Sequence, residues 1–180
     1  MLKRLVERIQ QKDQRAMSEL YQQYVGRLSS VCYRYVPDED DAKDVLQNSF
    51  VKIFTALQNF EYRDEPSFEG YLTKTVANEA LTFLRARKKL MFTDLQEDSV
   101  SQETDDEPEI EHITADDLHR LIRELPDGYR TVVNLYVFEG YSHRKIAELL
   151  GIKEATSATQ LYHAKQLLAR RIKEKMDEER

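Results

Sequence analysis

Several carboxylates and four histidines are the residues of this chain that could hold a metal or catalyse a reaction. Acidic side chains run from Asp38 to Asp41 and continue at Asp44, and such a cluster could serve a metal-dependent nuclease. Consecutive residues point in different directions around a helix, however, so the cluster is more typical of a helix start, where negative charge suits the helix dipole. The histidines, at positions 112, 119, 143 and 163, lack metal-ligand spacing, and the chain has no HExxH, P-loop or nucleophile-elbow motif. We therefore predict that the chain is not an enzyme and has no metal or other cofactor.

DNA binding is indicated by the residues that follow Ser142. This serine is a suitable N-cap, and apolar residues recur at helical spacing until Gly151, where a helix end favours a positive φ. A longer helical pattern begins at Glu154. A short helix, a glycine turn and a long helix together predict a helix-turn-helix over residues 143–162. The alternative is an ordinary helical hairpin in which the glycine is only a C-cap.

The second helix of this motif divides into two faces. Helical spacing assigns one stripe to the core, namely Ser157, Leu161, Ala164, Leu168 and Ile172. The opposite face should carry Ala155, Thr159, Tyr162, His163 and Gln166. Because this face has no arginine that could bind guanine bidentately, base recognition should be weak or directed to thymine methyl groups and adenine. Phosphate contacts, which position a domain without specifying sequence, should come from Arg144, Lys145, Lys153, Lys165, Arg170 and Arg171.

Three helices are predicted in the first part of the chain. One opens at Asp13 and continues to the break at Pro37, and the next opens in the acidic run 38–41 and continues through Leu57. The third spans about 67–89. The single thiol, Cys32, lies within the apolar positions of the first of these helices, so we expect it to be buried.

Aromatic and basic residues surround the start and one face of the third helix. The aromatic residues are Phe60, Tyr62, Phe68 and Tyr71, and the polar face is formed by Lys74, Asn78, Arg85 and Lys89. This combination suits unstacked bases and a phosphate backbone, because a stacked base contributes roughly 1–3 kcal/mol. Alternatively, the aromatic residues belong to the core and the basic run 85–89 is a solvated helix end.

Charge is distributed very unevenly along the 180 residues, whose formal net charge is −6. Residues 93–117 contain 11 acidic residues and no lysine or arginine, and the segment is poor in apolar residues. Such a segment cannot bury enough apolar surface to offset its ordering entropy, so we predict a flexible connector between domains 1–92 and 118–180. A merely solvated spacer is at least as good an interpretation of this connector as any specific role. His112 and His119 should be solvated in or beside this connector, and His143 and His163 should lie on exposed helix faces.

The whole chain is expected to be all-α, with two small helical domains. No stretch approaches the 18 consecutive apolar residues of a membrane span, and charges interrupt the apolar runs of the N-terminus. We expect a cytoplasmic protein without membrane insertion.

Three segments in collinear order resemble the sigma-70 family, specifically the small extracytoplasmic-function (ECF) sigma factors of bacterial RNA polymerase. DAKDVLQNSFVKIFTAL is similar to the family's region 2.2, and FEYRDEPSFEGYLTKTVANEAL is similar to regions 2.3 and 2.4. LPDGYRTVVNLYVFEGYSHRKIAELLGI is similar to region 4. Three motifs in order are far more specific than a helix-turn-helix alone, which occurs in many unrelated regulators.

The resemblance implies roles for individual residues. Contacts to the β′ clamp of core RNA polymerase would come from Asp44, Gln47, Asn48 and Lys52. Minus-10 DNA would be bound, and one of its bases captured, by Phe60, Tyr62, Arg63, Lys74, Asn78, Arg85, Lys88 and Lys89. Minus-35 DNA would be bound by Arg144, Lys145, Lys153, Ala155, Thr156, Thr159, Gln160, Tyr162, His163, Lys165 and Gln166. Further implied partners are the polymerase β flap, promoter DNA and an anti-sigma factor, and the acidic connector would lie near the path of nascent RNA.

Two departures from the family pattern concern the N-terminal domain. Tyr71 stands where the family usually has tryptophan, which keeps an aromatic ring, and Ala77 replaces a common arginine, which puts one backbone contact in doubt. The alternative function is a stand-alone helix-turn-helix regulator, which would not bind core polymerase.

Overall fold

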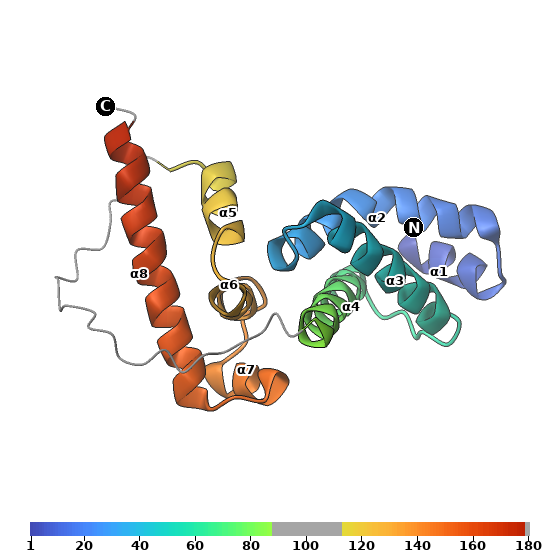
Figure 1. Cartoon of the computed structure of the whole chain (residues 1–180). Coiled ribbons are helices and arrows are strands. Elements are labelled where there is room, and N and C mark those ends of the chain that lie inside the picture. Colours follow the sequence, from blue (N-terminus) through green and yellow to red (C-terminus); the bar gives the residue numbers. More distant parts are fainter. Residues whose placement is uncertain (88–112, 179–180) are drawn as a thin grey trace. The chain divides into compact units, whose positions relative to one another are not determined.

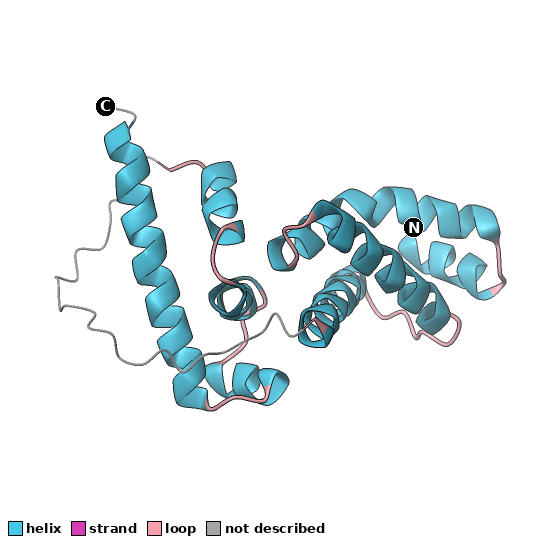
Figure 2. Cartoon of the chain, in the orientation of Figure 1, coloured by secondary structure: helices cyan, strands magenta, loops and turns pink. Residues whose placement is uncertain are grey.

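The computed structural model describes residues 1–87 and 113–178, and these residues form helices and connecting loops without any strand (Figures 1 and 2). The chain divides into two compact units, Met1–Arg87 and Lys88–Arg180. The all-α prediction is confirmed for the described residues. Most of the acidic connector lies outside them, so its predicted flexibility stays a prediction. Its last three residues belong to a helix that begins at Ala115, before the predicted boundary.

Unit 1 contains four helices: α1 (Leu2–Gln10), α2 (Gln14–Tyr35), α3 (Glu39–Leu57) and α4 (Glu65–Ala86). Helices α2, α3 and α4 pack pairwise against one another, and α1 packs on α2 and α3. Sequence periodicity did not lead us to predict α1, although its buried residues have ordinary helical spacing: Leu2, Leu5, Val6 and Ile9. Its charged residues lie between these positions, which is the pattern of a helix with one buried face.

Aspartates cap the N-termini of the three longer helices of unit 1. Asp13 accepts hydrogen bonds from two backbone N–H groups at 2.8 and 3.2 Å, Asp38 accepts one from Asp41 at 2.9 Å, and Asp64 accepts one from Ser67 at 2.8 Å. The acidic cluster at the start of α3 therefore acts as a helix start, as predicted. Capping by Asp64 places the start of α4 at Glu65, two residues earlier than the predicted start.

The thiol of Cys32 is fully buried, as expected from its place among apolar residues. It donates a hydrogen bond to the backbone carbonyl of Ala42 at 3.3 Å. Burial raises the pKa of this thiol to about 12. The thiolate is the reactive form of cysteine, so Cys32 is a structural residue of the α2–α3 contact.

Unit 2 contains α5 (Ala115–Arg123), α6 (Asp127–Val133), a π-helical turn η2 (Asn134–Phe138), α7 (His143–Leu150) and α8 (Glu154–Glu178). Helix α8 packs against α5, α6 and α7. The core of unit 2 is formed by Leu121, Ile122, Leu125, Val132, Val133, Leu135, Ile146, Leu161, Ala164 and Ile172. The small unit thus depends on one long helix that the three shorter ones cover.

A buried arginine holds the junction between α5 and α6. Arg130 is only 3% exposed, and its guanidinium donates hydrogen bonds to the carbonyl oxygens of Leu125 at 2.6 Å and Arg123 at 3.1 Å. It also pairs with the carboxylate of Asp127. Burial lowers the pKa of Arg130, and the neighbouring carboxylate opposes this shift. The guanidinium therefore satisfies carbonyl groups that the end of α5 leaves without helical partners.

Replacing this arginine should destabilise unit 2. We expect Arg130→Leu to lower the free energy of unfolding by about 2–4 kcal/mol, because buried carbonyl groups and a carboxylate lose their partner. Urea denaturation of the full chain, followed by circular dichroism, measures the change. Arg120→Leu is the matched control, since Arg120 forms an exposed pair with Asp117 within one helix and should contribute little. Equal stability of the two variants would contradict this role.

Candidate nucleic-acid interface

Helix α7 and the turn of the helix-turn-helix lie where they were predicted, and the second helix, α8, continues beyond residue 162 to Glu178. Ser142 Oγ caps α7 by accepting a hydrogen bond from the backbone N–H of Lys145 at 3.3 Å. Helix α7 ends at Gly151, whose φ of 69° and ψ of 34° lie in the left-handed region. The N–H groups of Gly151 and Ile152 both bond to the carbonyl oxygen of Ala147, at 2.8 and 3.1 Å. Backbone hydrogen bonds thus fix the turn between the two helices.

The buried stripe of α8 also lies where periodicity placed it. Ser157 and Ala164 are 0% exposed, and Leu161 and Ile172 are nearly so, while Leu168 is half-buried. One assigned DNA contact is wrong: Gln160 is only 5% exposed. It lies three residues after Ser157 and four before Ala164, so helical geometry places it on the core stripe. We therefore remove Gln160 from the DNA-binding set.

The outward face of α8 has an aromatic centre. Ala155 and Thr159 are exposed, and Tyr162 is 52% exposed. The Nε2 group of Gln166, which is half-buried, donates a hydrogen bond to the Tyr162 hydroxyl at 2.7 Å. These two side chains are thereby coupled one helical turn apart, and they present an aromatic ring with polar groups beside it.

Three histidines differ from their predicted surroundings, because each is half-buried against an aromatic ring from another helical element. His119 stacks on Phe138, with ring centroids 5.6 Å apart. His163 lies 6.3 Å from the Tyr129 ring, and His143 stacks on Tyr136 at 4.7 Å. His119 is therefore not fully solvated, and His143 and His163 are only partly exposed on their helix faces. Sequence periodicity cannot show which rings the other helices bring to these positions. His112 lies outside the described residues.

The cations that were predicted to contact phosphates differ in exposure. Arg144, Lys145, Lys153, Lys165 and Arg170 are exposed. Arg144 and Lys145 contact Glu148 at 3.7 and 3.2 Å, within the same short helix. Exposed pairs of this kind contribute little to stability, so phosphate oxygens can replace the carboxylate. Arg171 is half-buried and contacts Glu124 at 3.4 Å, which gives it a structural role as well.

Helix α3 of unit 1 carries an exposed polar stripe opposite its buried stripe. Asp44, Gln47, Asn48 and Lys52 are all exposed, and Lys52 forms an ion pair with Glu79 of α4. Val51 belongs to the same stripe and is 65% exposed. Sequence reasoning missed Val51, although its position out of phase with the apolar residues of α3 could have revealed it. An exposed apolar residue amid polar ones is a common feature of protein-binding surfaces.

The aromatic residues before α4 form a cluster around Phe68. This ring is 0% exposed and lies edge-on to Phe60 and Tyr24, with centroids 5.6 and 6.1 Å away, while Tyr62 lies at 5.9 Å. Phe60, Tyr62 and Tyr71 are only half-buried. The two alternatives for these aromatic residues, a DNA-binding surface and a part of the core, are therefore each partly right. Phe68 belongs to the core, and the other rings keep accessible surface. Burial and nearby carboxylates raise the pKa of Tyr62, so its hydroxyl stays protonated near neutral pH.

Helix α1 supports the loop that carries these aromatic residues. The Nε2 group of Gln10 donates hydrogen bonds to the carbonyl oxygens of Phe60 at 2.9 Å and Leu57 at 3.2 Å. Gln58 Nε2 in turn bonds to the carbonyl oxygen of Ile9 at 3.2 Å. No local motif marks Gln10, because its partners lie about 50 residues away in sequence.

One face of α4 presents the predicted polar residues. Lys74, Asn78 and Arg85 are exposed, as is Arg63 in the preceding loop, whereas Lys88 and Lys89 lie outside the described residues. Arg87 contacts Asp41 at 2.7 Å and lies 4.6 Å above the Phe83 ring, so it connects α4 to α3. Ala77 is only 4% exposed, so its side chain lies in the core and not on this face.

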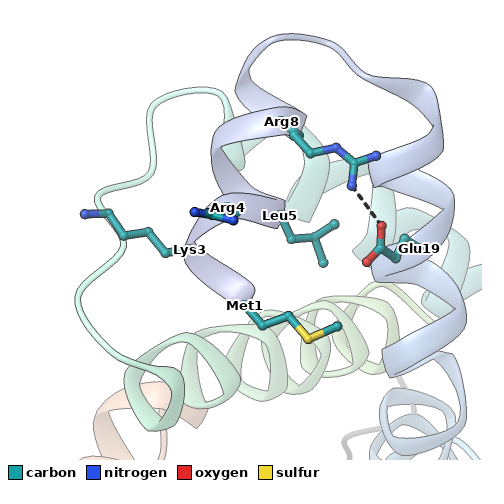
Figure 3. Close-up of a pocket in the computed structure, with 6 residues that line it drawn as sticks. All are labelled: Met1, Lys3, Arg4, Leu5, Arg8 and Glu19. Carbon is teal, nitrogen blue, oxygen red and sulfur yellow. Dashed lines mark hydrogen bonds and ion pairs between the residues drawn. The ribbon is translucent and has the colours of Figure 1, made fainter.

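A surface hollow beside α1 is a separate feature of unit 1 (Figure 3). It is lined by Met1, Lys3, Arg4, Leu5, Arg8 and Glu19. Arg8 contacts Glu19 at 3.0 Å and Asp13 at 2.8 Å, which joins α1 to the start of α2. Among the described residues, no three histidine, cysteine or acidic side chains are grouped to hold a metal, and no helix is long and apolar enough to cross a bilayer.

These features define a DNA-binding protein with a helix-turn-helix unit and a second, separate helical unit. Sequence comparison assigns both units: the description Sigma-70 region 2 matches residues 20–90, and Sigma-70, region 4 matches residues 115–168. The chain belongs to the sigma-70 family and is an ECF sigma factor, which binds core RNA polymerase and directs initiation at specific promoters. A stand-alone regulator would not need a region 2, so that alternative is set aside.

Named relatives agree with this assignment. The chain is 29% identical to the ECF RNA polymerase sigma-E factor of Haemophilus influenzae, and the match covers 93% of both sequences. It is 30% identical to the RNA polymerase sigma factor SigV of Bacillus subtilis over 77% of this chain and 80% of that protein. The fold is similar to that of the sigma factor RpoE from Bartonella quintana, solved with the anti-sigma factor NepR. That match has 18% identity and a TM-score of 0.50, and it covers 87% of this chain and 96% of the other.

The turn glycine of the helix-turn-helix gives a direct test of the motif. Gly151→Ala should destabilise unit 2 by about 1 kcal/mol, because a Cβ is strained at a φ of 69°. Gly26→Ala is the matched control, since Gly26 lies in the interior of α2 with open space around its missing Cβ. That change should instead stabilise unit 1 by about 0.5–1 kcal/mol. Thermal unfolding of both variants measures the two effects, and a stabilising Gly151→Ala would be inconsistent with the observed turn.

Proposed function

We propose that the two units divide the work of promoter recognition between three surfaces. The polar stripe of α3, with Asp44, Gln47, Asn48 and Lys52, binds the β′ clamp of core polymerase. The loop before α4 and the exposed face of α4 bind and open minus-10 DNA. Helix α8 enters the major groove at the minus-35 element, and unit 2 also contacts the β flap.

Exposure and chemistry support the α3 surface. Within the part of the chain that the structure describes, Asp44, Gln47 and Asn48 form no ion pair or side-chain hydrogen bond with another helix, whereas Lys52 contacts α4. The exposed Val51 adds an apolar contact at the centre of the stripe. Polar groups around a small apolar centre give a protein interface both affinity and a defined register.

The aromatic cluster supports binding of minus-10 DNA. A base leaving the duplex loses a few kcal/mol of stacking and pairing, and an aromatic ring can replace the stacking. Phe60, Tyr62 and Tyr71 keep partly exposed surface. The buried Phe68 ring contacts Phe60 and Tyr62, and Phe60 in turn contacts Tyr71. Lys74 and Arg85 lie on the same helix and supply positive charge for the separated strand. Lys88 and Lys89 extend this charge along the chain.

The outward face of α8 supports binding of minus-35 DNA. Thr156 and Thr159 can contact base edges or phosphates, and the ring of Tyr162 suits thymine methyl groups. Arg170 is exposed one turn beyond Gln166, at the C-terminal end of this face, and it and the other exposed cations of unit 2 suit phosphates. We infer that unit 2 gains much of its affinity from the backbone and only modest discrimination from the bases.

The cellular setting follows from this function. A factor that acts on core polymerase and promoter DNA works in the cytoplasm and needs no catalytic activity of its own. The surfaces of α3 and α8 are also those that an inhibitor would need to cover, so an anti-sigma factor is the expected regulatory partner.

Loss of the α3 amides should weaken polymerase binding. We expect Gln47→Ala combined with Asn48→Ala to reduce the affinity for core polymerase about tenfold, because two hydrogen-bonding groups are lost from the interface centre. Competition with the housekeeping sigma factor for limiting core polymerase measures the loss. Gln22→Ala with Gln23→Ala makes the same chemical change at exposed positions of α2 and serves as control. The assignment fails if both pairs have the same effect.

Changes on the face of α4 should affect strand opening more than polymerase binding. Asn78→Ala with Arg85→Ala removes a hydrogen-bonding group and a cation from the path of the separated strand. We expect about tenfold slower promoter opening by the holoenzyme, measured by permanganate reactivity of unpaired thymines, with core binding unchanged. Equal loss of opening and of core binding would show that this face has been misassigned.

A further inference from the structure

One side chain connects three elements of unit 2. His143 is the first residue of α7, its ring stacks on Tyr136 of η2 at 4.7 Å with an interplanar angle of 20°, and its Nδ1 lies 3.0 Å from Ser157 Oγ of α8. Sequence reasoning placed this histidine on an exposed face and gave it no function. These two contacts, together with its place in α7, instead put it at the junction of η2 with the two helices of the motif.

The two helices of the helix-turn-helix are thereby joined at two places. At the turn, backbone hydrogen bonds from Gly151 and Ile152 to Ala147 fix the end of α7. At the other end of α7, the hydrogen bond between His143 and Ser157 joins the helices through side chains. Ile146 and Ala147 fill the space between these points. A hinge fixed at one end alone leaves the crossing angle free to vary, whereas a second connection at the far end restricts it.

The polar character of this second connection matters for its geometry. Ser157 is 0% exposed, so its hydroxyl group lies away from solvent and depends on neighbouring protein atoms. A hydrogen bond is directional and weakens steeply as its angle departs from linearity, whereas an apolar contact tolerates sliding and rotation. The stack on Tyr136 fixes the plane of the imidazole ring, and this plane determines where Nδ1 points. The orientation of α8 is thus restrained by contacts to both α7 and η2.

We propose that His143 is a positioning residue for DNA recognition, which sets the angle at which α8 presents its outward face to the bases. The inference rests on the proposed role of α8 at the minus-35 element. Thr159 and Tyr162 lie on the far side of α8 from Ser157, so a rotation at the Ser157 contact moves both of them relative to the groove. Recognition requires interacting groups to be held within roughly 10–20° of their productive orientation. His143 itself need not touch DNA.

Two substitutions of His143 separate its two contacts. His143→Asn keeps a polar atom close to the position of Nδ1 and loses the ring, whereas His143→Phe keeps a ring for Tyr136 and loses the hydrogen bond. Ser157→Ala removes the same hydrogen bond from the other side without adding volume. His119→Phe is the matched control, because His119 also stacks on an aromatic residue of η2, at 5.6 Å, but lies on α5. All four variants are assayed as the full chain bound to core polymerase.

The measurement is selectivity at minus-35, taken as the ratio of holoenzyme affinities for a promoter with its own minus-35 element and with that element scrambled. Promoters are first found by mapping transcripts that the reconstituted holoenzyme makes on genomic DNA. We expect His143→Phe and Ser157→Ala to lower this ratio about tenfold, and His143→Asn to keep it within about threefold. His119→Phe should leave it unchanged. Thermal unfolding of each variant identifies any that is not folded.

Three results would separate failure of this inference from failure of the proposed function. Wild-type selectivity in both His143→Phe and Ser157→Ala overturns the inference and leaves the role of α8 intact. Loss of selectivity in His143→Asn but not in His143→Phe assigns the effect to the stack on Tyr136 and overturns the hydrogen bond as the determinant. If the wild-type holoenzyme does not distinguish the two promoters, the proposed minus-35 role of α8 fails before any variant is compared.

Discussion

Unit 2 depends on the burial of one stripe of α8. The helix is 25 residues long, and the short helices α5, α6 and α7 all pack against it. Isolated helices of seven to nine residues are marginal in water, so these short helices exist because α8 provides a surface for them. The same packing decides which residues of α8 remain outside. One face of α8 therefore stabilises unit 2, and the opposite face is available for DNA. The residues that α8 buries in the core determine which of its residues face outward.

In unit 1, too, the buried face of a helix determines which of its residues are exposed. The buried stripe of α3, which includes Val45 and Ile53, leaves a polar stripe exposed on the opposite side. Helical periodicity does not fix the position of the loop after α3. Gln10 of α1 donates hydrogen bonds to backbone carbonyl groups at the end of α3 and in this loop. Helix α1 precedes the matched region 2 segment and still contributes to the position of the aromatic cluster. A surface assigned to one motif thus depends on a helix outside it.

Polar residues at the junctions of unit 2 specify geometry that apolar packing leaves open. Arg130 closes the α5–α6 junction through main-chain carbonyl groups, and His143 with Ser157 joins the helices of the DNA-binding motif. Both sites bury groups whose desolvation is unfavourable unless the partners are correctly placed. A small helical unit with a modest core gains a defined shape in this way, and a surface that reads bases from one helix requires a defined shape.

The sequence by itself determined most of the architecture and the family. Helical spacing, with Asp13, the acidic run 38–41 and Ser142 as start signals, identified α2, α3, α7 and α8 and most of α4, because each is a local signal carried by residues within a few positions of one another. The family followed from three motifs in order. The left-handed conformation of Gly151 and the core stripe of α8 were likewise predictable from local pattern, and both are confirmed.

Only the tertiary structure decided the matters that depend on residues distant in sequence. It placed Gln160 in the core and His119, His143 and His163 against rings from other elements, and it gave Arg130 and Gln10 their partners. It also divided the aromatic residues near α4 into the buried Phe68 and its more exposed neighbours. Periodicity reports which side of a helix faces inward, but it does not report how far the neighbouring elements extend over that side. The burial of a residue at the edge of a stripe is set by those neighbours, and so is the partner that a polar side chain finds there.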